Sequence, residues 1–149
     1  MVTSAGLLVW RVRDTVREVL LAHPGGPFYT RKDDGVWSIP KGEHPPQEEP
    51  LDAARREYAE ELGLPAPVGP FVPLGDVALR SRKTVSAWAV EADPDLSRFV
   101  PGTFDLEWPP RSGRTQAFPE IDRVAWFDLD AAAVKLHPSQ LPFLQRLPG

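Results

Sequence analysis

Cysteine is absent from this sequence of 149 residues. The chain therefore has no disulfide scaffold, no cysteine-ligated zinc or iron–sulfur site and no thiol for covalent catalysis. Long hydrophobic runs are missing too: the longest early one, residues 5–10, is followed at once by Arg11 and Arg13. That run is too short to cross a membrane and lacks the order of a signal peptide. We therefore expect no membrane partner and a cytoplasmic location.

A strong excess of one charge is also missing. With 17 basic and 21 acidic residues the net charge is −4, so we expect no general attraction to nucleic acid or to anionic membranes. The 11 glycines and 18 prolines stay below the roughly 25–30% share that is typical of low-complexity chains. The length suits one domain with a sizeable core, and we expect residues 1–149 to form it.

Alternating apolar residues predict several strands. Leu8, Trp10 and Val12 share one side of a period-two run, and Asp14-Thr15 offers a turn before the next apolar segment. The first two strands can therefore pair as a hairpin. The segments expected as strands are residues 8–12, 18–23, 36–39, 70–79, 83–91 and 124–127.

The C-terminal third is predicted to hold short helices and one long loop. Asp128 is a suitable N-cap for a helix that ends at Leu136, and residues 139–147 form a possible final short helix. Residues 99–119 show no clean period and are rich in proline, glycine and arginine, so we expect a long loop there, often a sign of function. The whole pattern indicates one mixed α/β domain.

One segment predicts a helix more clearly than any other. Pro50 suits the first helical position, Gly63 suits the residue after the last turn, and Pro65 follows it. Glu48 and Glu49 lie where negative charge meets the positive helix N-terminus. Apolar residues recur at steps of three and four and form one stripe: Leu51, Ala54, Tyr58 and Leu62.

Three carboxylates crowd one side of this helix. At about 100° per residue, Glu57, Glu60 and Glu61 lie within an arc of roughly 100° beside the apolar stripe. Each raises the pKa of the others unless a cation lies between them. Arg55 and Arg56 offset part of this repulsion, but Mg²⁺ does so better, because it prefers oxygen ligands and also touches substrate phosphates. The alternative is a solvated acidic face, since glutamate is a good helix former.

The surroundings of these acids favour the metal. From Gly42 to Leu64 the sequence is GEHPPQEEPLDAARREYAEELGL, which resembles the Nudix box, G-x5-E-x7-R-E-U-x-E-E-x-G-U, where U is bulky and apolar. The residues in register with this box are Gly42, Glu48, Arg56, Glu57, Glu60, Glu61, Gly63 and Leu64. Two positions depart from the pattern: Tyr58 replaces the usual aliphatic residue, and Gln47 replaces a glycine. Neither change removes a ligand.

The resemblance implies an α/β/α sandwich, with a mixed β-sheet between helices. It also implies hydrolysis of diphosphates linked to a nucleoside or similar group, by water attack at phosphorus, with Mg²⁺ or Mn²⁺ as cofactor. Such an ion bridges phosphate oxygens and lowers the pKa of the attacking water. A chain of net charge −4 needs this neutralisation where it binds a diphosphate.

By the same resemblance, the box supplies the metal-binding and catalytic residues. Glu57, Glu60 and Glu61 hold the metals, and Gly42 adds its backbone carbonyl. Glu57 is alternatively the general base, or the residue that orients it. Arg56 is expected to hold Glu57 in place.

Basic residues outside the box are candidates for substrate phosphates. Lys41 follows a proline and precedes the metal loop, where a phosphate contact is expected; the alternative is an exposed loop lysine. Arg80 and Arg82 belong to a basic cluster that is equally a solvated turn between two strands. Arg111 lies in the long loop with Arg114 and is a candidate for gripping a distal phosphate.

One further acid is expected at the site. Glu120 ends the segment Phe118-Pro119-Glu120, and the proline holds it more firmly than a mid-loop acid. In many Nudix proteins a glutamate from this loop meets the box helix as a metal ligand or as the base, so Glu120 is assigned both roles here. Asp122 has a simpler salt-bridge role with its neighbour Arg123, and Glu107 lies beside a proline-rich turn.

The reaction class is better defined than the substrate. The Pro40-Lys41-Gly42 sequence resembles the diadenosine-polyphosphate and diphosphoinositol-polyphosphate hydrolases of the family. The candidate small-molecule substrates are dinucleoside polyphosphates, nucleoside triphosphates and nucleotide sugars such as ADP-ribose. The alternative function is a catalytically silent Nudix-fold module that binds nucleotides or regulates. Such a module is expected to lose box acids, and none is missing here.

Overall fold

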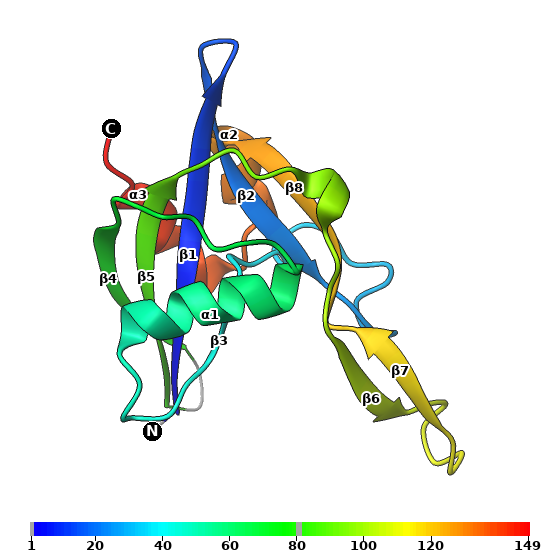
Figure 1. Cartoon of the computed structure of the whole chain (residues 1–149). Helices are drawn as coiled ribbons and strands as arrows, with labels where there is room; N and C mark the ends of the chain where they lie inside the picture. The colour runs from blue at the N-terminus through cyan, green and yellow to red at the C-terminus, as the bar shows by residue number, and fades with distance from the viewer. Residues whose placement is uncertain (1, 80–81) are drawn as a thin grey trace.

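The computed structural model describes residues 2–79 and 82–149 (Figure 1). Within the described residues, strands β1 to β3 precede the box helix α1, strands β4 to β8 follow it, and α2 and α3 end the chain. Helix α1 is the longest helix described. The strands are β1 (Val2–Arg13), β2 (Val16–Pro24), β3 (Lys41–Glu43), β4 (Val72–Leu79), β5 (Lys83–Glu91), β6 (Thr103–Glu107), β7 (Thr115–Pro119) and β8 (Ile121–Asp128). The helices are α1 (Pro50–Leu62), α2 (Leu129–Lys135) and α3 (Leu141–Gln145), with 3-10 turns η1 (Leu96–Arg98) and η2 (Pro138–Gln140).

The main sheet has the order β4-β5-β1-β2-β8, and β3 also pairs with β1. Strands β1 and β5 run parallel, whereas the other described neighbours are antiparallel, so the sheet is mixed. Near its C-terminal end β1 pairs with β2, and near its N-terminal end it pairs with β3, where Ala5 lies opposite Gly42. The start of the box is therefore part of the sheet.

Helices cover both faces of this sheet, with α1 in front of it and α2 and α3 behind it in Figure 1. Successive residues of β1 point to opposite faces: Leu7 packs in the cluster that contains Tyr58 of α1, and Leu8 packs in the cluster that contains Phe143 of α3. The expected α/β/α sandwich is confirmed. None of the described helices combines the length and the apolar character that a membrane span needs.

The predicted first hairpin and the predicted C-terminal helices are present. Strands β1 and β2 pair up to Arg13 and Val16, and the turn residues Asp14 and Thr15 both have positive φ. Asp128 caps α2, because its carboxylate accepts a hydrogen bond of 2.8 Å from the backbone N–H of Ala131. The last predicted helix is split into η2 and α3.

The prediction of a long loop over residues 99–119 is wrong. This segment contains β6 and β7, which pair as an antiparallel hairpin that extends away from the main sheet (Figure 1). Phe104 lies opposite Phe118 in this ladder. Each strand has only five residues, and the proline-rich turn between them hides the period-two pattern.

The prediction of a strand at residues 36–39 is also wrong. Ser38 bridges Ala22 and Trp37 bridges Leu136, but these are isolated bridges to opposite neighbours, so no continuous ladder forms. The strand begins instead at Lys41, after Pro40, whose carbonyl accepts a hydrogen bond from Leu7 N–H. Strand β4 begins at residue 72, two residues later than predicted.

The unusual Tyr58 of the box predicts a stability gain on substitution. Its side chain is fully buried under the sheet, and no hydrogen-bond partner for its hydroxyl lies within residues 2–79 or 82–149. Burial raises the pKa of Tyr58 to about 12. An unpaired buried hydroxyl costs about 1–3 kcal/mol, so Tyr58→Phe should raise the free energy of unfolding in urea titrations by about 1 kcal/mol. A loss of stability would mean that the hydroxyl has a partner.

Candidate active site

Helix α1 carries the candidate site, and its ends are fixed by the residues the sequence indicates. Pro50 occupies the first turn after Glu49, and Gly63 closes the helix in the left-handed conformation at φ 64°. The N–H of Gly63 donates to the carbonyl of Ala59 at 2.8 Å. The helix buries Ala53, Ala54, Tyr58 and Leu62 against the sheet. This packing sets the carboxylates of the helix at the edge of the core.

Arg56 is the cation around which these carboxylates are arranged. Its Nε and Nη2 donate to the two oxygens of Glu48, each at 2.8 Å, which is a bidentate pair. Its Nη1 donates to Glu57 Oε1 at 2.9 Å and to Glu60 Oε2 at 3.1 Å. Hydrogen bonding to Arg56 lowers the pKa of Glu48, and the carboxylates raise the pKa of Arg56. The guanidinium therefore joins the loop before the helix to two residues of the box face.

Glu57 lies directly against the backbone of Gly42. A Cβ added to Gly42 would come within 2.0 Å of Glu57 Oε2, so only glycine leaves room for the carboxylate here. Burial raises the pKa of Glu57, and the charges of Glu60 and Glu120 add to this, although Arg56 acts in the opposite direction. We infer that burial prevails, because the Glu57 side chain is only 14% exposed.

Glu61 is the most strongly perturbed acid of the helix. Its Oε2 accepts a hydrogen bond of 3.2 Å from the backbone N–H of Lys41. Burial raises the pKa of Glu61 to about 8, and the charges of Glu57 and Glu120 act in the same direction. Glu60 differs, because its side chain is 60% exposed.

Glu120 reaches the box helix from a segment that is distant in the sequence. It lies between β7 and β8, and its charge contributes to the raised pKa of both Glu57 and Glu61. A Cβ added to Gly102 would lie 3.7 Å from the carbonyl of Glu60 and 3.8 Å from Glu120 Oε2. The structure therefore places Glu120 near the box acids.

The donor set fits a hard divalent cation. Carboxylate oxygens and a backbone carbonyl are the ligands that Mg²⁺ prefers, and a cation relieves the charge repulsion that raises these pKa values. Within the described ranges, no three acidic or histidine side chains already converge as a cluster that could hold a metal ion. Arg56 binds two of the carboxylates and the Lys41 amide binds a third, so cation binding must compete with these contacts.

Lys41 lies where the box meets a cavity of about 780 Å³. The cavity is enclosed by the loop after β2, the end of β4 and the segment around η2. Its polar lining residues besides Lys41 are Tyr29, Ser38, His137, Ser139 and Gln140. His137, Ser139 and Gln140 could not be predicted as site residues from the sequence, because they lie about a hundred residues from Lys41 and belong to no motif.

The other predicted substrate residues that the structure describes, Arg82 and Arg111, lie in turns between strands. Arg111 lies at the far end of the β6–β7 hairpin, where its N–H donates to Glu107 Oε1 at 3.1 Å (Figure 1). Arg82 lies exposed in the turn between β4 and β5, at φ 60°. Arg80 falls outside the described residues. Phosphate contacts by these three arginines stay predictions.

Comparison with known proteins identifies the family. The model of the NUDIX domain matches residues 3–147, so the chain belongs to the NUDIX domain family. With its complete box it is a Nudix hydrolase, an enzyme that acts on phosphorus anhydrides. No curated protein sequence matches the chain.

Solved structures agree with this assignment. The Nudix hydrolase RenU from M. smegmatis is 27% identical, with a TM-score of 0.64 over 97% of this chain and 82% of that one. A C. elegans Ap4A hydrolase is 21% identical, with a TM-score of 0.62 over 98% of this chain and 94% of that one. The NUDIX domain of Shewanella oneidensis NrtR, complexed with ADP ribose, is 17% identical, with a TM-score of 0.64 over 98% and 85%. The last two show likeness of fold.

The contact between Gly42 and Glu57 generates a prediction. In Gly42→Ala, the new Cβ must displace the Glu57 carboxylate, and a misplacement of about 1 Å can cost about 10²-fold in rate. We expect turnover to fall by about that factor and Mn²⁺ affinity, measured by calorimetry, to weaken, while the melting temperature changes little.

Gly102→Ala is the matched control. Its Cβ meets only ordinary contacts near the same acids, so turnover should stay close to that of the unsubstituted protein. Full activity in Gly42→Ala would contradict the assignment of Glu57 to the site.

Proposed function

We propose that residues 1–149 form a single Mg²⁺-dependent pyrophosphohydrolase domain that cleaves a diphosphate linkage in a nucleoside diphosphate derivative. The observation that carries this proposal is a pair of carboxylates with raised pKa at the start of the box: Glu57 lies against Gly42, and Glu61 accepts the N–H of Lys41. The charge of Glu120 acts on both, and Lys41 lines the neighbouring cavity. Mn²⁺ is the expected substitute ion.

The metal would be held by the Gly42 carbonyl and by Glu57, Glu60, Glu61 and Glu120. When bound, it supplies charge neutralisation at the phosphates and a more acidic water. Arg56 restrains Glu57 and Glu60 through its hydrogen bonds, so that these carboxylates keep a fixed geometry.

Glu120 is the better candidate for the base that takes the proton of the attacking water. One oxygen of Glu57 already accepts an N–H of Arg56, so this oxygen is less free to take a proton. For Glu120, no side-chain hydrogen bond occurs within the described part of the chain, and its side chain is exposed. Lys41 is suited to bind a phosphate oxygen at the mouth of the cavity.

The cavity supports a nucleotide substrate. Its volume of about 780 Å³ falls within the roughly 300–1,000 Å³ usual for small-molecule sites. Tyr29 and His137 offer flat rings for a base, and Ser139 offers a hydroxyl for its polar edge. Dinucleoside polyphosphates, nucleoside triphosphates and nucleotide sugars all combine such a group with a diphosphate, and the Ap4A and ADP ribose of the structural neighbours belong to these classes.

A substrate panel with identification of the products tests the proposal. Members of the three classes are incubated with Mg²⁺, with Mn²⁺ and with EDTA, and phosphate-containing products are separated by chromatography. We expect hydrolysis with either ion and none with EDTA, and the products show which phosphorus is attacked. Tight nucleotide binding without turnover under saturating metal would favour the silent binding module.

The buried charge of Glu61 generates a further prediction. In EDTA, Glu61→Gln should raise the melting temperature by a few degrees, because it removes a carboxylate whose ionisation is opposed by burial and by two like charges. Adding Mg²⁺ should then stabilise Glu61→Gln less than it stabilises the unsubstituted protein. Glu60→Gln is the matched control for the melting temperature in EDTA, since the exposed Glu60 carries no comparable burial cost. Equal Mg²⁺ stabilisation of the protein and of Glu61→Gln would remove Glu61 from the metal site.

The role assigned to Glu120 predicts a loss of rate. Positioned acid–base catalysis is typically worth about 10²–10⁴-fold, so Glu120→Gln should lower kcat at least about tenfold with little change in melting temperature. Glu107→Gln, at the other end of the same hairpin, should retain its activity. Full activity in Glu120→Gln, together with an inactive Glu57→Gln, would place the base on α1.

A further inference from the structure

His23 is a fully buried histidine at the end of β2, outside the box and outside the cavity. Its Nδ1 lies 2.7 Å from Asp122 Oδ1, and its Nε2 lies 2.6 Å from the backbone carbonyl of Lys32. Each ring nitrogen of His23 thus lies within hydrogen-bond distance of an oxygen from another segment. The ring therefore joins three separate segments: β2, the loop after it and the start of β8.

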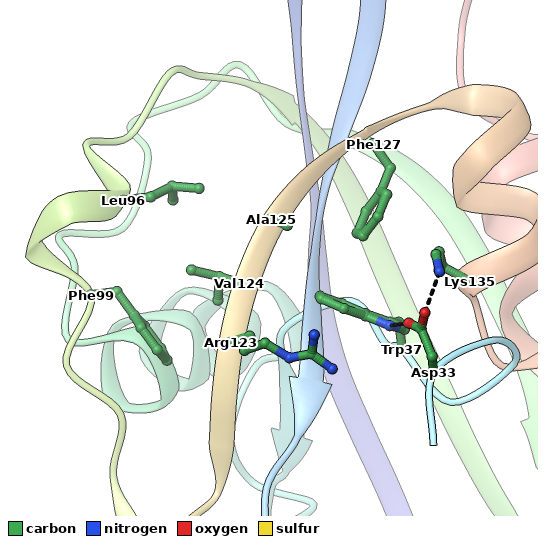
Figure 2. Close-up of a pocket in the computed structure, with 9 residues that line it drawn as sticks. All are labelled: Asp33, Trp37, Leu96, Phe99, Arg123, Val124, Ala125, Phe127 and Lys135. Carbon is green, nitrogen blue, oxygen red and sulfur yellow. Dashed lines mark hydrogen bonds and ion pairs between the residues drawn. The ribbon is translucent and has the colours of Figure 1, made fainter. Parts of the chain in front are cut away.

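The His23 ring is also held by aromatic packing. It packs edge-on against Trp37, with the ring centroids 5.1 Å apart. Figure 2 shows Trp37 beside Asp33, which accepts the indole N–H at 2.8 Å and also pairs with Lys135. Arg123 lies over the Trp37 ring, 5.2 Å from its centroid, and 3.7 Å from Asp122. These contacts hold the Trp37 ring in place against His23.

The Asp122 contact lies at an irregularity in the sheet. His23 pairs with Arg123, but the next residue, Pro24, pairs with Ile121, so Asp122 is an extra residue in β8. Such a β-bulge re-aims the side chains beside it. The hydrogen bond from His23 holds the side chain of this extra residue and therefore fixes the bulge.

The backbone of Glu120 is held immediately beyond the bulge. The N–H of Gly25 donates to the carbonyl of Glu120 at 2.9 Å, and the N–H of Glu120 donates to the carbonyl of Gly102 at 2.9 Å. The fit is close, since a Cβ on Gly25 would come within 1.9 Å of the carbonyl oxygen of Pro119. A shift of the bulge would move Glu120 relative to α1.

We propose that His23 and Asp122 are positioning residues that fix the β8 bulge and thereby aim the Glu120 carboxylate at the box helix. This inference rests on the proposed function for its effect on rate, but not for its effect on structure. Neither residue is expected to touch the substrate. Removing an outer partner of this kind typically costs about 10–100-fold in metal affinity or activity.

The test uses the full chain with two disruptive substitutions and one conservative substitution. His23→Phe keeps an aromatic ring but removes both ring nitrogens, and Asp122→Ala removes the carboxylate while keeping the buried histidine. Asp122→Asn keeps an oxygen at the same place and should restore most of the behaviour of the unsubstituted protein. Asp105→Asn, on the exposed side of β6, is the control for loss of a surface carboxylate.

Hydrogen exchange tests the structural half without any turnover. The amides of Gly25 and Glu120 should exchange about tenfold faster in His23→Phe and Asp122→Ala, but not in Asp122→Asn or Asp105→Asn. Mn²⁺ affinity, measured by calorimetry, should weaken about tenfold in the first two variants. Unchanged exchange and unchanged Mn²⁺ affinity in Asp122→Ala would overturn the proposal, even if His23→Phe fails to fold.

A double-mutant cycle tests the effect on rate. Each disruptive variant should lower kcat about tenfold with little change in KM, yet add almost nothing in the Glu120→Gln background, because the positioned group is then already absent. Additive losses would overturn the proposal and leave His23 as a support of the fold. Full activity of Glu120→Gln alone would instead contradict the role proposed for Glu120, while the exchange data still decide whether His23 fixes the bulge.

Discussion

The geometry of the candidate site depends on the balance between one guanidinium and a face of like-charged carboxylates. Arg56 donates to Glu48, Glu57 and Glu60, but its hydrogen bonds do not extend to Glu61, whose pKa rises to about 8. Partly exposed ion pairs add little stability, so the importance of Arg56 is geometric: it fixes where the acids lie. The repulsion that remains among the carboxylates is relieved when a cation binds or when one of them takes up a proton.

The apolar packing of the sandwich offsets the stability that is lost to repulsion among the carboxylates. Helix α1 buries an apolar face that includes Tyr58 and Leu62 against the sheet, and this burial does not depend on the charge state of the acids beside it. Because β3 pairs with β1, the backbone of Gly42 is held at a fixed distance from the helix. Glycine is required there by the nearby Glu57 carboxylate and not by a positive φ. Apolar burial thus stabilises the fold, whereas ionic side chains make up the candidate site.

The parts of the molecule that could be predicted from the sequence are those set by neighbours in the chain. The ends of α1, its apolar stripe and the contacts of Arg56 with Glu57 and Glu60 depend on spacings of one to four residues. The β6–β7 hairpin could not be predicted from the sequence, because its strands are short and pair across a proline-rich turn. The pair formed by His23 and Asp122 joins residues 99 positions apart, and no local pattern marks it.

The contrast between local contacts and contacts between distant segments has a consequence for the chemistry of the site. The box acids keep their mutual arrangement as long as α1 is a helix, so their geometry is robust. Glu120 has no such local support: its position is fixed by Gly25, by Gly102 and by the bulge at Asp122, each brought near by the folding of distant segments. Small changes in the packing of β8 therefore alter the distance between Glu120 and the helix without changing the box. The reaction geometry is thus most sensitive to residues that lie outside the motif.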